Sequence, residues 1–366
     1  MKFKLVAFAG FAIFFQNAAQ AQSSVTLWGL IDEGMLYNSN ANGHDRISMA
    51  TMLTSSKFGF TGIEDLGNNY KIVFSLENGF NPATGAMSNA NLAFGKRTYI
   101  GLSSPFGTLL AGRQYSAILD WVKWFSVNQS FAGGLPGLYM NDVDDVGGDI
   151  HFNNTIKYKS PDYNGFGFGG QYSMNSHTDS ATSGTAWGVG TAYVGSNFGA
   201  GAAFQHIGNP QAYAAFQNNA TYTNVYYGRA ITLASGWNIA AAGVFANYKA
   251  LNVQFLYSRV NFYLPSGKDI SVFNNYQLGF NYSLTPAIQA AAFYVYSNVS
   301  QAGEGGFNNQ HFGVVGHYLL SKSTDLYAIA MGILAHGNVA GAQAVGQPAS
   351  SASRQFLAGI GIRKKF

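Results

Sequence analysis

The fold is decided by stretches such as YQLGFNYSL, residues 276–284, in which every second residue is apolar. Successive side chains of a β-strand point to opposite faces of a sheet. This segment therefore predicts a strand with one apolar face and one polar face. The same alternation recurs at residues 70–77, 166–174 and 356–363. We expect an all-β protein whose strands separate an apolar environment from a polar one.

The connections between these strands distinguish a membrane barrel from a soluble β-sandwich, which would share the two-residue period. Short turns at residues 65–68, 103–107, 160–164 and 321–324 take turns with long polar loops rich in Gly, Asn and Ser. Transmembrane barrels have this asymmetry, with tight periplasmic turns and longer outside loops. The sequence therefore favours a transmembrane barrel.

Composition supports the same interpretation. Charged residues make up 10% of the chain and aromatic residues 15%, whereas typical soluble proteins have about 25% charged residues. Beyond the N-terminal segment no apolar stretch approaches the length of a membrane helix. A closed barrel is the other architecture that leaves no peptide group exposed to lipid.

The number of strands follows from the alternating segments. We predict one domain, a transmembrane antiparallel 16-stranded β-barrel, which would leave an aqueous lumen. An even number places both chain ends on the periplasmic side. Residues 220–231 could be a further strand or part of a long loop. The predicted strands begin near Val25, Ser55, Asn69, Lys96, Thr108, Asn153, Gly165, Thr185, Phe198, Trp237, Asn252, Asn275, Ala287, Gln310, Asp325 and Arg354.

The N-terminus has the features of a secretory signal peptide. Lys2 and Lys4 precede an apolar run at residues 5–15, and Ala19 and Ala21 form an Ala-x-Ala cleavage site. We expect residues 1–21 to be cleaved, leaving a single barrel domain at 22–366. Such a chain would be exported through the periplasm to the outer membrane.

Charge and cysteine content exclude several classes of function. Removing residues 1–21 takes away two lysines, so the formal charge falls from +4 to +2. A nearly neutral chain without a basic block gives no electrostatic footprint for nucleic acid. The absence of cysteine excludes disulfides and thiolate zinc sites. No cofactor or metal is expected.

Several longer strings resemble the general porins of β-proteobacteria and Neisseria. The resemblance extends over essentially the whole predicted mature chain and is strongest in its first half. It is carried by SVTLWGLID at 24–32, KFGFTGIEDLG at 57–67, ENGFN at 77–81, YIGLSSPFGT at 99–108, GRQY at 112–115, NNTIKYKSP at 153–161 and GIRKKF at 361–366.

This resemblance implies a homotrimer of sixteen-stranded barrels in outer-membrane lipid and lipopolysaccharide. Each barrel would hold a water-filled channel for passive diffusion of small hydrophilic solutes and ions, with an inward-folded third loop. The final Phe366 resembles the signal by which the barrel-assembly machinery recognises its clients. Such a protein is not an enzyme.

The resemblance also implies where ion selectivity would arise, because charged rings in a constriction govern which ions pass. The third loop should run from about Ser116 to Ile150, and basic residues of the barrel wall should face it. Lys57 and Arg97 stand where the family has wall arginines. The acidic residues of the loop are Asp142, Asp144, Asp145 and Asp149, and the basic candidates are Lys57, Lys71, Arg97, Arg113, His151 and Lys157.

Some positions depart from the family pattern. Thr61 stands where a lysine is common, and His151 where an arginine usually precedes the sixth strand. Because an imidazole is mostly uncharged at neutral pH, we predict weak ion selectivity that shifts toward anions on acidification. Arg113 could face the lumen or the trimer axis. Glu33 lies in phase with apolar residues and would suit a subunit interface better than lipid.

Other functions remain as alternatives. A substrate-specific channel would use aromatic residues such as Trp121, Trp124 and Phe125, which could instead anchor the loop. The loop aspartates could bind calcium or be ordinary solvated charges. An enzyme is disfavoured because no nucleophile elbow, zinc-binding helix motif or phosphate loop occurs. Long outside loops would also suit an adhesin or surface antigen.

Overall fold

The computed structural model describes most of the chain. The described residues are 23–89, 92–129, 132–137, 139, 142–174, 184–210, 234–303, 305–339 and 341–366. The predicted signal peptide, the mature start at Gln22 and the ambiguous segment 220–231 lie outside them. In this part of the chain, no helix is long and apolar enough to cross a membrane.

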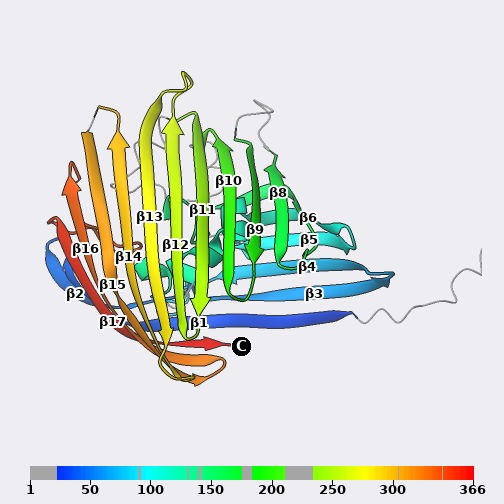
Figure 1. Cartoon of the computed structure of the whole chain (residues 1–366), viewed down its shortest axis with the longest axis horizontal. Helices are drawn as coiled ribbons and strands as arrows, with labels where there is room; N and C mark the ends of the chain where they lie inside the picture. The colour runs from blue at the N-terminus through cyan, green and yellow to red at the C-terminus, as the bar shows by residue number, and fades with distance from the viewer. Residues whose placement is uncertain are drawn as a thin grey trace, which may run out of the picture.

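The described residues form one antiparallel sheet of seventeen strands in sequence order, and this sheet closes on itself through β1 and β17 (Figure 1). Between β6 and β7 lie α1 (Ala117–Trp121), η1 (Lys123–Phe125), η2 (Val127–Gln129) and α2 (Gly134–Gly137). The strands are β1 (Ser24–Ala41), β2 (His44–Ala50), β3 (Lys57–Gly67), β4 (Tyr70–Gly79), β5 (Arg97–Ser104), β6 (Gly107–Tyr115), β7 (His151–Lys159), β8 (Phe166–Ser173), β9 (Ala186–Val194), β10 (Phe198–Gly208), β11 (Gly236–Tyr248), β12 (Leu251–Tyr263), β13 (Asp269–Ser283), β14 (Ile288–Gln301), β15 (Gly305–Ser321), β16 (Thr324–Gly337) and β17 (Arg354–Lys365).

The seventeen strands make a barrel of sixteen, which confirms the predicted fold. β2 and β3 both pair with β1, β2 with its C-terminal half and β3 with its N-terminal half. They are therefore two parts of one barrel strand, interrupted at residues 51–56. The sequence predicted β3 but not β2, and every other predicted strand has its counterpart.

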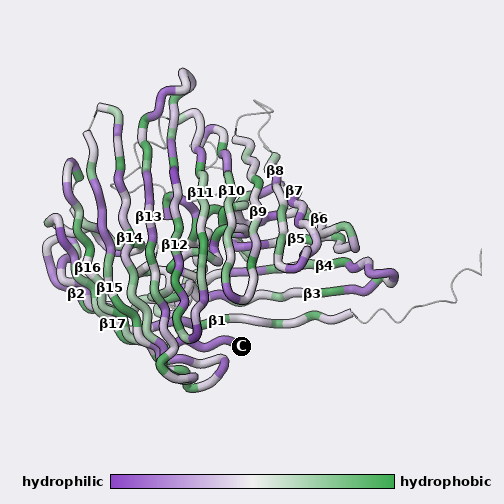
Figure 2. The backbone as a smooth tube through the Cα atoms, in the orientation of Figure 1, coloured by the Kyte–Doolittle hydropathy of each residue, from purple (hydrophilic) through white to green (hydrophobic). Residues whose placement is uncertain are grey.

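Burial along the strands is inverted relative to a soluble protein. In β13, Asn275, Gln277 and Asn281 are at most 2% exposed, whereas Leu278 and Phe280 are 36% and 41% exposed. Hydrophobic and hydrophilic residues alternate along the strands instead of gathering in one layer (Figure 2). A barrel with polar residues inside and apolar residues outside presents the apolar row to lipid.

The barrel closes where the chain ends meet. β17 pairs with β1 from Leu30–Lys365 to Asn38–Leu357, and Phe366 exchanges two backbone hydrogen bonds with Gly29, of 2.9 and 3.0 Å. A Cβ atom at Gly29 would lie 2.3 Å from the Phe366 ring. The ring of Phe366 therefore packs directly over Gly29, where the lack of a side chain leaves room for it.

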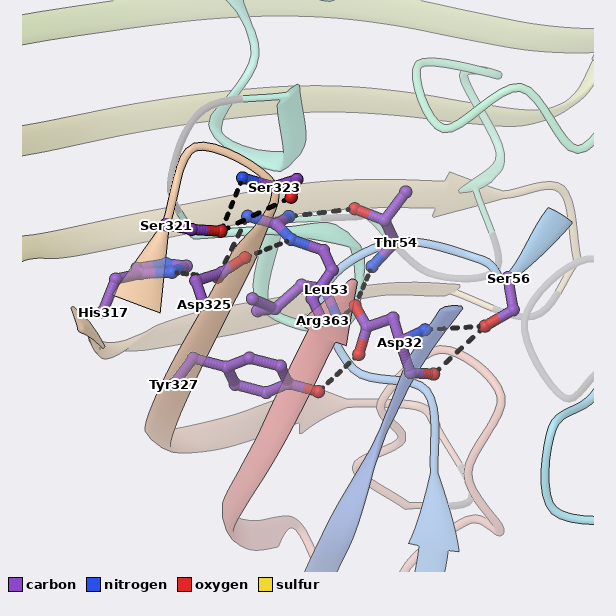
Figure 3. A network of polar contacts seen from close by, with 10 residues as sticks. All are labelled: Asp32, Leu53, Thr54, Ser56, His317, Ser321, Ser323, Asp325, Tyr327 and Arg363. Carbon is purple, nitrogen blue, oxygen red and sulfur yellow. Dashed lines mark hydrogen bonds and ion pairs between the residues drawn. The ribbon is translucent and has the colours of Figure 1, made fainter. Parts of the chain in front are cut away.

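Asp32 holds the interruption between β2 and β3 to the closing seam (Figure 3). Its buried carboxylate accepts hydrogen bonds from the backbone N–H groups of Leu53 (3.1 Å) and Thr54 (2.7 Å) and from the Tyr327 hydroxyl. Arg363 of β17 donates to the Thr54 hydroxyl (3.3 Å). We name these residues, Asp32, Leu53, Thr54, Tyr327 and Arg363, the seam network.

Candidate functional site

The third loop, residues 116–150 between β6 and β7, lies against the inner face of the barrel wall. Ser116 begins α1 by accepting a hydrogen bond from Leu119 N (3.1 Å). Further along, Ala117 N donates to Gln205 Oε1 (3.2 Å), and Val127 N donates to Gln277 Oε1 (3.0 Å). Gln205 and Gln277 belong to the polar inner rows of β10 and β13 and are at most 1% exposed. The loop is therefore held by side chains that face the lumen.

Two aromatic residues fit the loop onto glycines of the wall. Trp121 lies over Gly190, where a Cβ atom would come within 2.5 Å of the indole. Phe125 is fully buried, with its Cβ 2.5 Å from the position of a Cβ at Gly243, and stacks with Phe245 at 5.9 Å between ring centroids. These contacts give Trp121 and Phe125 the anchoring role that the sequence left open.

The interruption at residues 51–56 also contacts the third loop. Gly134 N donates to Leu53 O (2.7 Å), and Leu135 N donates to Met52 O (2.9 Å). The backbone N–H of Leu53 donates to Asp32 and its carbonyl accepts from Gly134. Leu53 therefore links the third loop directly to the seam network.

The buried carboxylate of Glu77, on β4, forms ion pairs with two cations of the barrel wall. Lys57 Nζ lies 3.3 Å from Glu77 Oε1, and Arg97 Nη2 lies 3.0 Å from Glu77 Oε2. The Tyr115 hydroxyl donates to Glu77 Oε1 at 2.9 Å. Glu77 and Arg97 are direct cross-strand partners, so the sheet register itself brings this pair together.

A second carboxylate, Asp120 of α1, faces the wall from the loop. It pairs with Lys157 Nζ at 2.6 Å and with Lys159 Nζ at 2.7 Å, both on β7. Burial raises the pKa of Asp120, but the two ammonium groups outweigh it and hold that pKa below its ordinary range. Asp120 therefore stays ionised and ties α1 to β7.

Lys123 of η1 differs from the wall cations because, in the described part of the chain, it contacts an aromatic ring and not a carboxylate. Among the described residues it makes no ion pair, and its Nζ lies 4.7 Å from the centroid of the Trp124 ring. Burial, together with the positive charges of Lys159, Lys57 and Arg97, lowers the pKa of Lys123, although Asp120 opposes this shift. Lys123 therefore adds a fifth cation to the four that pair with Glu77 and Asp120.

Three of the aspartates predicted to face the basic wall instead accept hydrogen bonds from the loop backbone or from β12. Asp142 accepts hydrogen bonds from Gly147 N (2.7 Å) and Asp149 N (3.1 Å), and Asp145 accepts one from Ile150 N (2.8 Å). Asp144 accepts one from the Ser258 hydroxyl (2.6 Å) on β12.

Burial dominates the titration of these carboxyls. It raises the pKa of Asp142 and Asp145 well above the ordinary value and that of Asp144 to about 7. Asp149 is exposed and lines, with Arg46 and Gln347, a polar cavity of about 380 Å³. Three of the four predicted aspartates thus hold the loop, while the carboxylates that meet the basic wall are Glu77 and Asp120.

The predicted basic residues divide into two sets. Lys57, Arg97 and Lys157 take part in the two clusters just described. Lys71 is exposed, six residues along β4 from Glu77, or about 20 Å at the rise of a strand. The structure therefore does not bring Lys71 to this site.

Arg113 and His151 are both buried. Arg113 Nε donates to Gly95 O (2.7 Å), and its Nη1 donates to Asn153 Oδ1. The His151 ring is 3% exposed and lies 5.0 Å from the Tyr115 ring, centroid to centroid. Arg113 thus holds the segment before β5, and neither side chain lines open space.

The sequence reasoning did not select Glu77, Asp120, Lys123 or Lys159 as site residues. Lys159 lies two residues after Lys157 and so shares its face, which the strand period could have shown. Asp120 is the one carboxylate in the apolar string AILDW at 117–121, a signal that a buried partner is needed. Among the described residues, no group of His, Asp or Glu side chains is arranged to hold a metal ion.

The family model described as Gram-negative porin matches residues 6–332 of the chain. The chain belongs to the Gram-negative porin family. It is an outer-membrane β-barrel protein of a family whose members are not enzymes.

Individual relatives agree with this family. The porin is 34% identical over 200 residues to an outer membrane porin protein of Bordetella pertussis, covering 50% of each chain. It is 36% identical over 202 residues to outer membrane porin protein 32 of Delftia acidovorans, covering 53% of this chain and 55% of that one. The chain thus spans about half the length of these relatives.

Solved structures share the fold. An anion-selective porin from Comamonas acidovorans superposes with a TM-score of 0.76 at 21% identity, covering 94% of this chain and all of that one. The trimer form of OmpT from Vibrio cholerae has a TM-score of 0.65 at 12% identity, with 94% and 99% coverage.

Proposed function

We propose that this porin forms a water-filled channel for the passive diffusion of small hydrophilic solutes and ions. The observation that carries the proposal is the polar interior, where the third loop and the facing wall carry paired charges around Glu77 and Asp120. Paired charges along the inner face of the barrel fit a lumen filled with water and do not fit a packed apolar core. The exposed apolar rows outside place this interior across the outer membrane.

Ion selectivity should favour anions weakly. Five cations, four on the wall and one in the loop, lie near the two carboxylates Glu77 and Asp120. They are Lys57, Arg97, Lys157 and Lys159 on the wall and Lys123 in the loop. An excess of fixed positive charge attracts anions and repels cations. The likeness in fold to a porin described as anion-selective supports this direction.

A homotrimer would account for Glu33. Its carboxylate lies on the outer face of β1 between Ile31 and Met35, which are 41% and 53% exposed. A carboxylate facing lipid is costly, and a subunit contact would cover it. The trimer form of OmpT, which shares the fold, supports this assembly, and Phe366 at the seam is the proposed signal for the barrel-assembly machinery.

The channel is tested by single-channel recording in a planar bilayer under a salt gradient. We expect ohmic current in steps of three and a small reversal potential of the sign that marks anion preference. Folded protein that carries no current would contradict the pore and return attention to an adhesin. A reversal potential favouring cations would contradict the selectivity alone.

The loop should respond to pH through Asp144. A carboxyl whose pKa is raised to about 7 when docked, from about 3.8 when free, favours docking below pH 4. This contribution is lost as pH rises from about 4 to about 7. We therefore expect current noise from loop motion to rise across this interval, and anion preference to fall as the carboxylate ionises.

Two variants separate this explanation from the one based on His151. Asp144→Asn should reduce the pH dependence between pH 4 and pH 8, to which Asp142 and Asp145 also contribute, whereas His151→Gln should leave it in place. The reverse result would assign the pH response to the histidine. The reversal potential and the noise spectrum are recorded at each pH.

A further inference from the structure

Lys123 and Trp124 place an ammonium group and an exposed indole side by side inside the barrel. Trp124 is 53% exposed, although Val122 and Phe125 of the same loop are fully buried. Phe125 and Trp121 occupy the wall side through the glycines of β9 and β11. The indole of Trp124 therefore projects from the opposite side of the loop, toward the open lumen.

Lys123 supplies the positive charge beside this indole. Lys123 Nζ lies 4.7 Å from the ring centroid and forms no ion pair among the described residues. Four cations of the wall, Lys57, Arg97, Lys157 and Lys159, are each paired with Glu77 or Asp120. Lys123 therefore has hydrogen-bond donors available to a passing anion.

An exposed indole and an adjacent ammonium group select a particular ligand chemistry. Flat aromatic rings stack on indole in offset or edge-on arrangements. A carboxylate accepts charge-assisted hydrogen bonds from an ammonium group. A small molecule that carries both groups would satisfy both contacts at once, whereas an aliphatic carboxylate or a neutral sugar would satisfy one.

We propose that Lys123 and Trp124 form a binding site for aromatic carboxylates inside the channel. This inference rests on the proposed function, because solutes reach the pair through the lumen. The site would slow and enrich such solutes at the third loop as they pass. General diffusion of other small solutes would continue beside it.

The chain contains a matched pair outside the lumen. Lys249 Nζ lies 5.3 Å from the centroid of the Tyr248 ring, and Tyr248 is 70% exposed in the outward row of β11. This pair has the same two chemical groups but faces away from the pore. Substitutions there control for the loss of a surface cation and an aromatic ring.

The experiment measures reduction of single-channel current by benzoate, with cyclohexanecarboxylate and maltose as comparison probes. We expect saturable reduction by benzoate at concentrations where the other two have little effect. Trp124→Leu should raise the half-blocking concentration of benzoate about 2- to 10-fold, the range given by aromatic stacking. Lys123→Gln should raise it about 3-fold, and Tyr248→Leu with Lys249→Gln should leave it unchanged.

The possible outcomes separate this site from the pore itself. Ohmic current that benzoate and cyclohexanecarboxylate reduce equally would overturn the binding site and leave the channel standing. Equal reduction by maltose would show a neutral stacking surface and would also overturn it. Unaltered block in Trp124→Leu would show that benzoate binds elsewhere. Folded protein without current would overturn both the channel and the site.

Discussion

Asp32→Ala is expected to destabilise the barrel by about 3 kcal/mol or more. The carboxylate accepts hydrogen bonds from Leu53 N, Thr54 N and the Tyr327 hydroxyl, and it is fully buried. Each buried donor left without an acceptor costs about 1–3 kcal/mol. The midpoint of urea unfolding in detergent, followed by tryptophan fluorescence, measures the loss.

Asp65→Ala is the matched control for Asp32→Ala. Asp65 lies near the end of β3, beside a short turn, and accepts one local hydrogen bond, from Gly67 N at 2.8 Å. We expect this change to cost about 1 kcal/mol at most. Equal midpoints for the two variants would show that the seam network does not stabilise the barrel. Tyr327→Phe, which removes one donor, should fall between them.

Glu77→Gln is expected to give the largest change in ion selectivity. It frees the charges of Lys57 and Arg97, which now lie 3.3 and 3.0 Å from the carboxylate. A unit charge acts on an ion 4 Å away with about 1 kcal/mol even in bulk water. The anion-to-cation permeability ratio should therefore rise about fivefold, as measured by the reversal potential.

The control for Glu77→Gln removes one negative charge far from the loop. Asp162→Asn alters an exposed residue in the turn between β7 and β8, and asparagine keeps the acceptor for Gly165 N. Its reversal potential should match that of the unaltered protein. If both variants shift the potential alike, selectivity reflects overall charge and not the Glu77 cluster. Unchanged heat resistance of each folded variant on a gel verifies folding.

The strands could be predicted from the sequence because lipid and water impose a strict two-residue period on the wall. β2 was not predicted because its sequence, HDRISMA at residues 44–50, begins with three polar residues, as a loop would. Its pairing with β1 becomes evident only once the register is known. The interruption that follows it depends on Asp32, whose partners are distant in the chain.

The charged site could be predicted only in part. Lys57, Arg97 and Lys157 follow from the inward phase of their strands, but which carboxylate meets them depends on register and loop path. Asp142 and Asp145 adopt left-handed backbone conformations, with φ of 52° and 57°. These turns direct their carboxylates to backbone N–H groups of the loop, and strand periodicity carries no information about them.

The pairing of β1 with β17 also has a kinetic consequence. The first and last strands are separated by nearly the whole chain, so the contacts that close the barrel are the most distant in sequence. Until β17 arrives, β1 has an unpaired edge along its C-terminal half, which any other strand could extend. We therefore expect closure to be the last step of folding, and the edge of β1 to be open to pairing with other chains until β17 is in place.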